Sequence, residues 1–189
     1  MRDFEEDIQE CLKVLKAGGL ILYPTDTIWG IGCDATNDEA IEKIYKLKKR
    51  SDEKAMIVLV AEERDIMQHV AGPDLSLFDY LQKATKPTTV VYDDALGFAD
   101  NLVGNDGSIA IRICNDEFCR NLLKRFRKPV VSTSANISGM PAPKIFNGIS
   151  SEIKNGVDYI VNYRQDDSEP AQPSSLIKWR NGKVIVLRE

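Results

Sequence analysis

The sequence predicts a mixed α/β domain, in which a twisted and mostly mixed β-sheet is flanked by helices. Of its 189 residues, 43% are hydrophobic and 29% are charged, which is ordinary usage for a single globular domain. Short apolar segments typical of strands alternate along the chain with segments of helical period. The alternation has no strict βαβ regularity, which favours a mixed sheet over a doubly wound one. We therefore expect one domain over residues 1–189.

The first third of the chain begins with a helix that ends at a glycine pair, residues 18–19. In the second of two short strands, Gly30 and Gly32 leave room for the close approach of a backbone or a ligand. Thr36 and Glu39 have the spacing of a capping box and predict the start of a second helix. The elements expected here are a helix over 4–15, strands over 20–23 and 28–33, a helix over 40–47 and a strand over 56–60.

The rest of the chain continues the alternation and becomes richer in strands. A short helical stretch over 65–70 carries the single histidine, His69, which we expect at the surface. Residues 164–173 are polar and contain two prolines, so we expect a mobile loop there. The other elements expected are helices over 75–81 and 117–125, and strands over 88–92, 108–113, 130–131, 159–161, 176–179 and 184–187.

Composition excludes several classes of function. One histidine cannot supply a site with two histidine ligands to a metal, and it makes a Ser-His-Asp triad very improbable. A net charge of −4 argues against a surface built to coat nucleic acid, although a local basic cavity is compatible with it. The four cysteines form no Cys-x-x-Cys pair and are expected to be reduced thiols of the core.

Targeting signals and common nucleotide motifs are missing from the sequence. The longest apolar run, 55–61, is far shorter than the roughly 20 residues that span a bilayer. The acidic N-terminus does not read as a signal peptide, so we expect a cytoplasmic protein without membrane association. The P-loop pattern, the Gly-x-Gly-x-x-Gly fingerprint and the aromatic motif of RNA-recognition modules do not occur. A nucleotide bound by this chain would be held by a less common binding motif.

Three polar clusters follow the ends of predicted strands. Residues 23–27 place two hydroxyls beside a carboxylate in a turn, and residues 46–54 hold four lysines and one arginine. Residues 132–139 combine hydroxyls, an amide and a glycine, the groups from which anion sites are built. Each cluster also has an ordinary structural interpretation, as a turn, a solvated helix end or a loop.

Taken together in this order, the clusters resemble the YrdC domain of threonylcarbamoyl-AMP synthases, which begin the threonylcarbamoyladenosine modification of tRNA. The matching motifs extend over residues 18–189. They are Gly19-Leu-Ile-Leu-Tyr-Pro-Thr-Asp-Thr-Ile-Trp-Gly-Ile-Gly-Cys-Asp-Ala35, the Lys-x-Arg pattern at Lys48 and Arg50, Ile109-Ala-Ile-Arg112, Ser132-Thr-Ser-Ala-Asn-Ile-Ser-Gly139, Pro173-Ser-Ser-Leu-Ile177 and Val186-Leu-Arg188.

The resemblance implies a positively charged central cavity that binds ATP, L-threonine and bicarbonate, with Mg²⁺ accompanying the triphosphate. Carboxylation of the threonine amine gives a carbamate, which attacks the α-phosphorus and releases pyrophosphate. The enzyme would be a nucleotidyltransferase, and its product would pass to a downstream tRNA threonylcarbamoyl transferase complex. Such chemistry needs positioning and positive charge more than a side-chain nucleophile, which suits a chain with one histidine.

The same resemblance assigns roles to individual residues, and it implies no metal ligand from the protein. The implied catalytic residues are Lys48, Arg50, Ser134 and Asn136. ATP would be bound by Arg50, Lys54, Ser108, Ser134, Asn136 and Arg188. L-threonine would be bound by Thr25, Thr27, Arg112, Ser132 and Ser174, with Arg112 as the partner of its carboxylate.

The chain departs from the family pattern at several positions, and residues 84–87 stand in place of the usual Trp-Pro-Gly-Pro. Ser51 follows Lys-x-Arg where a proline is usual, Asp26 stands where a glutamate is usual, and Leu59 stands where many members carry a polar residue. A YciO-like paralogue is therefore one alternative. A module that binds double-stranded RNA or tRNA is another, because residues 124–128 form a second basic cluster. The carbamoyl chemistry of hydrogenase maturation is disfavoured, since no acylphosphatase-like or zinc-finger segment is recognisable.

Overall fold

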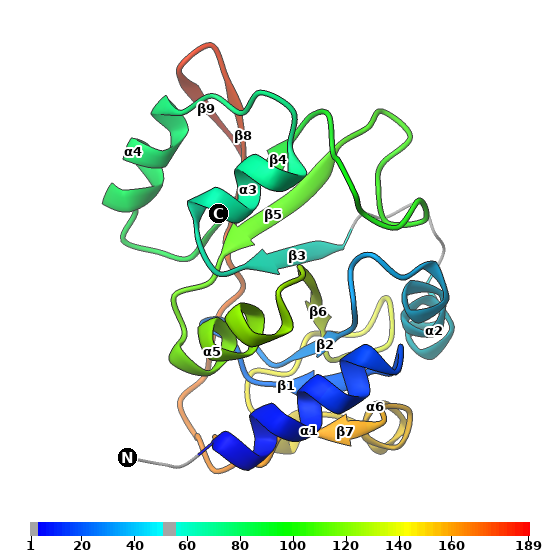
Figure 1. Ribbon diagram of the computed structural model, residues 1–189. Coiled ribbons are helices and arrows are strands. Elements are labelled where there is room, and N and C mark those ends of the chain that lie inside the picture. The colour runs from blue at the N-terminus through cyan, green and yellow to red at the C-terminus, as the bar shows by residue number, and fades with distance from the viewer. Residues whose placement is uncertain (1–3, 51–55) are drawn as a thin grey trace.

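The computed structural model describes residues 4–50 and 56–189 and is organised around one nine-stranded sheet. The strand order is β7-β1-β2-β6-β3-β5-β4-β8-β9 (Figure 1). In chain order the strands are β1 (Ile21–Tyr23), β2 (Gly30–Gly32), β3 (Ile57–Val60), β4 (Thr88–Tyr92), β5 (Ile109–Ile113), β6 (Val130–Ser134), β7 (Tyr159–Ile160), β8 (Ser175–Arg180) and β9 (Lys183–Arg188).

Parallel and antiparallel pairs are mixed throughout the sheet, which confirms the predicted fold class. The pairs β1–β7, β3–β5 and β4–β8 are parallel. The pairs β1–β2, β2–β6, β3–β6, β4–β5 and β8–β9 are antiparallel. A doubly wound sheet is mostly parallel, whereas five of the eight strand pairs here are antiparallel, as the irregular alternation in the sequence indicated.

The helices are amphipathic and pack their apolar sides against the sheet. Helices α1, α3 and α5 lie on one side of it (Figure 1). Fully buried apolar residues, such as Ile8 of α1 and Phe118 of α5, join this layer to the strands. In chain order the helices are α1 (Glu5–Lys16), α2 (Asp38–Lys48), α3 (Glu63–His69), α4 (Ser76–Lys83), α5 (Glu117–Phe126) and α6 (Ser151–Asn155), with a 3₁₀ turn at Phe146–Gly148.

Helix α2 begins differently from the capping box expected at Thr36. Its N-cap is Asn37, whose Oδ1 accepts the Ala40 backbone N–H at 3.1 Å. The backbone N–H and the hydroxyl of Thr36 both donate to Asp34 Oδ1, at 2.9 and 2.7 Å. The expectation at Thr36 was wrong because a buried carboxylate two residues earlier already engages that hydroxyl.

Several smaller expectations concern the cysteines, the single histidine and the short helices. All four cysteines are buried free thiols, as expected for the core. His69 is partly exposed and its Nδ1 lies 3.1 Å from the Leu96 carbonyl oxygen. The sequence did not predict α6, a single short turn. Over residues 4–50 and 56–189, no helix is both long and apolar enough to cross a membrane.

Candidate functional site

A cavity of about 360 Å³ opens on the side of the sheet opposite α3 and α5. Side chains alternate between faces along a strand, so Ala110 and Arg112 of β5 face the cavity while Ile111 between them faces the core. Seven residues assigned to the site by the sequence line this one cavity. They are Thr27, Arg50, Arg112, Ser132, Ser134, Ser174 and Arg188.

Three arginines contribute to the cavity, and no carboxylate is among the described residues that line it. Arg50 follows the end of α2, Arg112 comes from the middle of the sheet and Arg188 from its edge strand. Arginine presents a planar fork of donors that matches carboxylate and phosphate oxygens. The lining is therefore suited to an anionic ligand.

Arg112 is the most buried of these cations, with 3% of its surface exposed. Its Nη2 donates to Thr27 Oγ1 at 3.2 Å and lies 3.1 Å from Asp26 Oδ1. Its Nε is buried and has no hydrogen-bond partner among the described residues. A buried donor without a partner carries a desolvation cost, which a bound anion would relieve. Asp26 and Thr27 thus orient the Nη2 group of Arg112, while its Nε is available to a ligand.

The turn after β1 holds Thr25 and Thr27 in fixed positions. Their hydroxyl oxygens lie 2.9 Å apart, and Thr25 Oγ1 also donates to the Ile28 carbonyl at 2.8 Å. Thr27 reaches the cavity, whereas Thr25 lines a neighbouring cavity of about 470 Å³. The turn was read from sequence as two hydroxyls flanking a carboxylate, and Asp26 is the carboxylate that pairs with Arg112.

The opposite rim of the cavity is formed by the segment that enters β8. Ser174 is buried, and its Oγ lies 2.7 Å from Thr89 Oγ1 of β4. Arg188 of β9 donates to the Ser174 carbonyl through Nε and Nη2, at 3.3 and 3.0 Å. Sequence reasoning missed Thr89, whose one signal is a polar residue at a buried position of an apolar strand.

Lys48 does not line the cavity, although the sequence pairs it with Arg50. It is 2% exposed, so the solvated-helix-end interpretation of its cluster is wrong for this residue. Its Nζ donates to the carbonyls of Ser134 and, at 2.6 Å, Asn136, and lies 3.5 Å from Asn136 Oδ1. The Ser138 N–H donates to the Lys48 carbonyl at 2.8 Å. Lys48 therefore fixes the course of the loop that follows β6.

Burial changes the protonation of both basic residues at the end of α2. It lowers the pKa of Lys48 from 10.5 to about 8, with a further contribution from the charge of Arg50. Burial also lowers the pKa of Arg50, whose Nη1 donates to Thr133 Oγ1 at 3.3 Å. The chain turns between them at Lys49, which has left-handed φ and ψ of 51° and 44°. That turn sends Lys48 to the loop and Arg50 to the cavity.

The remaining predicted site residues lie outside the cavity lining. Asn136 is held by Lys48 and donates through Nδ2 to the carbonyls of Ile137 and Met140, at 3.1 and 2.6 Å. Ser108 precedes β5, and its N–H donates to Asp106 Oδ1 at 3.1 Å. By strand alternation it belongs to the same face as Ala110. Lys54 and Ser51 lie outside the described residues.

The segment expected to be a mobile loop, 164–173, borders the site. Arg164 at its start donates through Nη1 to the Thr25 carbonyl at 3.2 Å and to Asp116 Oδ2 at 2.9 Å. Its Nε donates to Asp167 Oδ2 at 2.6 Å. These bonds attach the segment to the turn that carries Thr25 and Thr27. The cavity of about 470 Å³ is lined by this segment and by that turn, and it shares Thr27 and Trp29 with the cavity of about 360 Å³.

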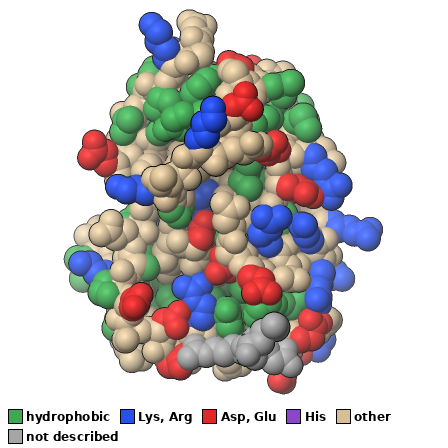
Figure 2. All heavy atoms as spheres, turned by 90° about the vertical axis from the view of Figure 1, so that its left-hand side faces the viewer, with side chains coloured by type: hydrophobic (Ala, Val, Ile, Leu, Met, Phe, Trp, Pro, Cys, Tyr) green, Lys and Arg blue, Asp and Glu red, His purple; other side chains and the backbone are tan. Residues whose placement is uncertain are grey.

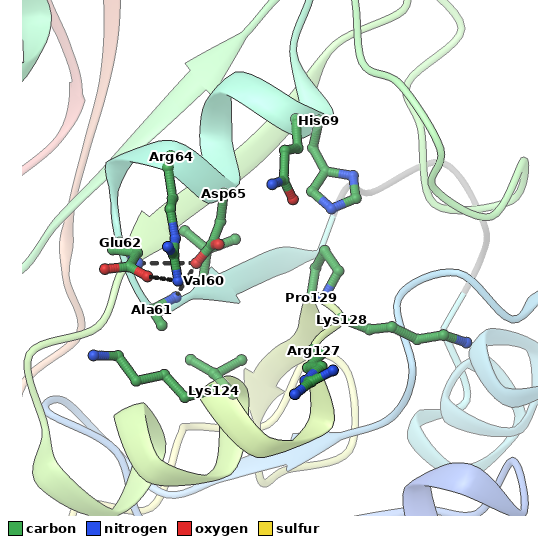
Figure 3. Close-up of a pocket in the computed structure, with 12 residues that line it drawn as sticks. Val60, Ala61, Glu62, Arg64, Asp65, His69, Lys124, Arg127, Lys128 and Pro129 are labelled. Atoms are coloured by element: carbon green, nitrogen blue, oxygen red, sulfur yellow. Dashed lines mark hydrogen bonds and ion pairs between the residues drawn. The ribbon is translucent and has the colours of Figure 1, made fainter.

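A separate cavity of about 540 Å³ lies on the helix side, between α3 and the end of α5 (Figure 3). The basic cluster at 124–128 contributes to it, but Lys128 is directed to Asp34, with 2.6 Å between Nζ and Oδ2. Asp65 accepts the backbone N–H groups of Ala61 and Glu62, both at 3.0 Å. Most of the polar residues that line this cavity thus already have partners within the protein.

In Figure 2, acidic and basic side chains are interspersed across the face shown.

Metal ligands of the protein do not cluster in the described part of the chain. No group of three or more His, Cys, Asp or Glu residues within 4–50 and 56–189 has an arrangement that could hold a metal ion.

Comparison with known proteins relates the whole arrangement to one family. A family model named Sua5_yciO_yrdC, described as telomere recombination, matches residues 13–189. A curated protein from Saccharophagus degradans, named threonylcarbamoyl-AMP synthase, is 36% identical over 143 residues, which is 72% of each chain. One of the same name from Photobacterium profundum is 32% identical over 162 residues, 82% of this chain and 86% of the relative.

The fold recurs in a solved structure of lower sequence identity. Sua5 from P. abyssi, solved in complex with L-threonine, superposes with a TM-score of 0.87 at 20% identity. The match covers all of this chain and 55% of that one, so this chain spans about half of that Sua5 protein. At this identity the likeness establishes the fold alone.

Proposed function

Because the chain belongs to the Sua5/YciO/YrdC family, we propose that it is an L-threonylcarbamoyladenylate synthase. It makes threonylcarbamoyl-AMP and pyrophosphate from L-threonine, bicarbonate and ATP, and is thus a nucleotidyltransferase. The product supplies the threonylcarbamoyl group for tRNA modification, through a separate transferase complex. Both curated relatives carry the synthase name, and one of them is matched over 86% of its length.

The observation that carries the proposal is the convergence of three arginines and several hydroxyls in one cavity. Arg112 has a buried Nε that lacks a partner in the described structure, and its guanidinium is oriented by Asp26 and Thr27. This arrangement suits a carboxylate, so we assign Arg112 to the carboxylate of L-threonine. Thr27, Ser132 and Ser174 offer hydroxyls around the rest of a small polar amino acid.

Arg50 and Arg188 lie elsewhere in the same cavity and suit the phosphates of ATP. As the carbamate oxygen attacks the α-phosphorus, negative charge moves onto the departing pyrophosphate. Fixed guanidinium groups stabilise that charge without reorganisation, and the reaction needs no protein nucleophile. Ser134 lies in the lining, and the loop that Lys48 holds places Asn136 just beyond it.

Mg²⁺ enters this scheme with the triphosphate. Since the described residues that line the cavity include no carboxylate, the ion would be held by phosphate oxygens and water, which Mg²⁺ favours. Its contribution would be to neutralise phosphate charge. Orientation of the substrates remains the task of the arginines and hydroxyls.

The direct test is pyrophosphate release from ATP and Mg²⁺, with L-threonine and bicarbonate present or omitted in turn. Release that requires both establishes the synthase activity. ATP binding without release would contradict it and would favour a YciO-like paralogue, with Leu59 as the first position to change. Salt-sensitive RNA binding without ATP binding would favour the RNA-binding module.

Substitution of Arg112 tests the assignment of the threonine carboxylate. Arg112→Lys keeps the charge but loses the two-pronged geometry, so KM for L-threonine should rise about tenfold or more, with a smaller change for ATP. Arg180→Lys, at an exposed position of the same sheet, is the matched control. An equal rise in both KM values would contradict this assignment without affecting the proposed reaction.

A further inference from the structure

Two buried hydroxyls meet where β4 pairs with β8, and they share one hydrogen bond. Thr89 of β4 is fully buried, and Ser174, which directly precedes β8, is 1% exposed. Their hydroxyl oxygens lie 2.7 Å apart. Thr89 is two residues before Val91, which lines the cavity of about 360 Å³, so both side chains lie on the same face of the sheet. Ser174 lines this cavity, whereas Thr89 is not among the described residues of the lining.

The direction of this hydrogen bond follows from the partners of each hydroxyl. A hydroxyl has one hydrogen to donate and two lone pairs that accept. Among the described residues, the Ser174 oxygen is the one hydrogen-bond partner of the Thr89 hydroxyl. Thr89 therefore donates to Ser174, because the reverse direction would leave a buried hydrogen without an acceptor. The hydrogen of Ser174 is then left for a ligand in the cavity.

The hydroxyl of Thr27 has the opposite role in the same cavity. Thr25 gives its hydrogen to the Ile28 carbonyl, so Thr27 donates to Thr25 across the 2.9 Å between their hydroxyl oxygens. Thr27 Oγ1 also accepts from Arg112 Nη2 at 3.2 Å. The hydrogen of Thr27 is therefore engaged within the protein, and a lone pair remains for a ligand. Thr27 can accept from a bound ligand, whereas Ser174 can donate to it.

These directions indicate which group of the amino acid each hydroxyl contacts. With the carboxylate of L-threonine bound to Arg112, its amine and its side-chain hydroxyl remain. The N–H groups of the amine are donors, and they match the lone pair of Thr27. The lone pair of the amine has to stay free for carboxylation, so the amine is not the acceptor for Ser174. The remaining acceptor is the side-chain oxygen of L-threonine.

We propose that Thr89 is a positioning residue, which fixes the Ser174 hydroxyl as a donor to the side-chain oxygen of L-threonine. The inference rests on the proposed function for the identity of the amino acid. The pair then selects a hydroxylated amino acid over one of the same shape without the hydroxyl. A site with a fixed buried donor disfavours a ligand that lacks the matching acceptor, because the donor is left unpaired.

Isothermal titration calorimetry with L-threonine and with L-α-aminobutyrate, which has hydrogen in place of the side-chain hydroxyl, tests this proposal. The unaltered chain should bind L-threonine at least about tenfold more tightly than L-α-aminobutyrate. Thr89→Val keeps the shape but no longer holds the Ser174 hydroxyl, so the preference should fall about fivefold, through weaker binding of L-threonine. Thr89→Ser retains a hydroxyl and should retain the preference. Thr88→Val removes the neighbouring hydroxyl, which donates to the Lys86 carbonyl at 3.0 Å, and is the matched control.

A double-mutant cycle tests whether Thr89 acts through Ser174. Ser174→Ala should abolish the preference, and adding Thr89→Val to it should change neither affinity further. An equal loss of affinity for both amino acids in Thr89→Val would overturn the proposal, and so would an effect that persists in the Ser174→Ala background. A thermal melt of each variant establishes that it is folded.

The binding experiment is independent of turnover, so it separates this inference from the proposed reaction. Binding of L-threonine with the expected preference but without pyrophosphate release would contradict the reaction and leave the role of Thr89 standing. Threonine-dependent pyrophosphate release with an unchanged preference in Thr89→Val would overturn the role of Thr89 and leave the reaction standing.

Discussion

Lys48 and Arg50 are two residues apart and carry the same charge, yet they occupy different environments. The left-handed turn at Lys49 directs Arg50 into the cavity and leaves Lys48 against the loop after β6. In this motif Arg50 lines the cavity, whereas Lys48 holds the loop after β6. Ser134, the last residue of β6, lines the cavity, and Asn136 lies in the loop that follows it.

Replacing the Lys48 ammonium should disturb catalysis through the loop. Lys48→Met removes the ammonium donors to the Ser134 and Asn136 carbonyls and leaves the Asn136 N–H as a donor to Ser134. Displacement of site groups by about 1 Å can cost about 10²-fold in rate. We expect kcat/KM for pyrophosphate release to fall by that order, with faster proteolysis of the 134–140 loop. Lys46→Met is the control, since the Lys46 side chain is 74% exposed on the same helical turn. Loss of rate without change in proteolysis would contradict a loop-holding role.

The lowered pKa of Lys48 makes stability depend on pH in a defined direction. Between about 8 and the ordinary value of 10.5, the unfolded chain binds a proton that the folded chain has lost. The free energy of unfolding should therefore rise with pH across this window, by at most about 3 kcal/mol from this group. Urea unfolding of the unaltered chain and of Lys48→Met isolates the contribution. If the two pH profiles run parallel, Lys48 is not the titrating group.

At the scale of elements, the hairpin of β1 and β2 shows how glycine permits close packing. The sequence indicated a close approach at Gly30 and Gly32, and in the structure Ser132 Oγ lies nearest Gly30 while the ring of Tyr23 approaches Gly32. An added Cβ at Gly32 would lie 2.6 Å from Tyr23 Cε1 and 2.9 Å from the Val131 carbonyl oxygen. The Tyr23 hydroxyl donates to that same carbonyl at 3.0 Å, so the ring cannot move away without losing the bond.

Gly32→Ala should accordingly destabilise the fold. Overpacking of a buried site costs about 1–3 kcal/mol, and we expect a loss of this size in the free energy of unfolding. Gly148→Ala is the matched control, because its added Cβ would lie 3.4 Å from Pro143 Cβ, an ordinary contact. Denaturant unfolding of both variants measures the difference. Equal stability of the two would mean that the hairpin adjusts more easily than its packing indicates.

At the scale of the whole molecule, charge distribution separates two kinds of ligand. The net charge is −4, and the face in Figure 2 intersperses acidic and basic groups, while three arginines gather in one cavity. An enclosed cationic site binds a small anion with limited dependence on salt. A surface that binds RNA through many phosphates depends steeply on salt, because binding releases counterions.

Salt dependence therefore distinguishes these ligands experimentally. We expect ATP binding in the presence of L-threonine to weaken only a few-fold between about 50 and about 200 mM salt. Any binding of double-stranded RNA that uses six or more phosphate contacts should weaken by about 10³-fold or more over the same range. Fluorescence anisotropy with labelled ATP and labelled RNA measures both. A steep loss of ATP affinity would place the nucleotide on an open surface instead of in the cavity.

The sequence by itself determined the mixed sheet and the order of most elements, and its resemblance to the family named seven of the residues that meet in the cavity. Apolar periodicity marks strands and helices, whereas Arg112, Ser174 and Arg188 lie in none of the three polar clusters and were assigned by the family resemblance alone. The sequence did not predict the short helix α6 or the N-cap at Asn37. The Ser150 hydroxyl caps α6, and the Asp34 carboxylate binds Thr36 and leaves Asn37 as the cap of α2.

Only the tertiary structure decided which of the predicted site residues face the cavity. Lys48 and Arg50 have similar local sequence, and their separation depends on a single left-handed residue and on a loop 86 positions away from Lys48. Thr89 joined the site through β4–β8 pairing, which links segments distant in the chain. Burial, hydrogen-bond partners and strand neighbours are properties of the assembled sheet, because they are set by contacts that no local pattern of residues records.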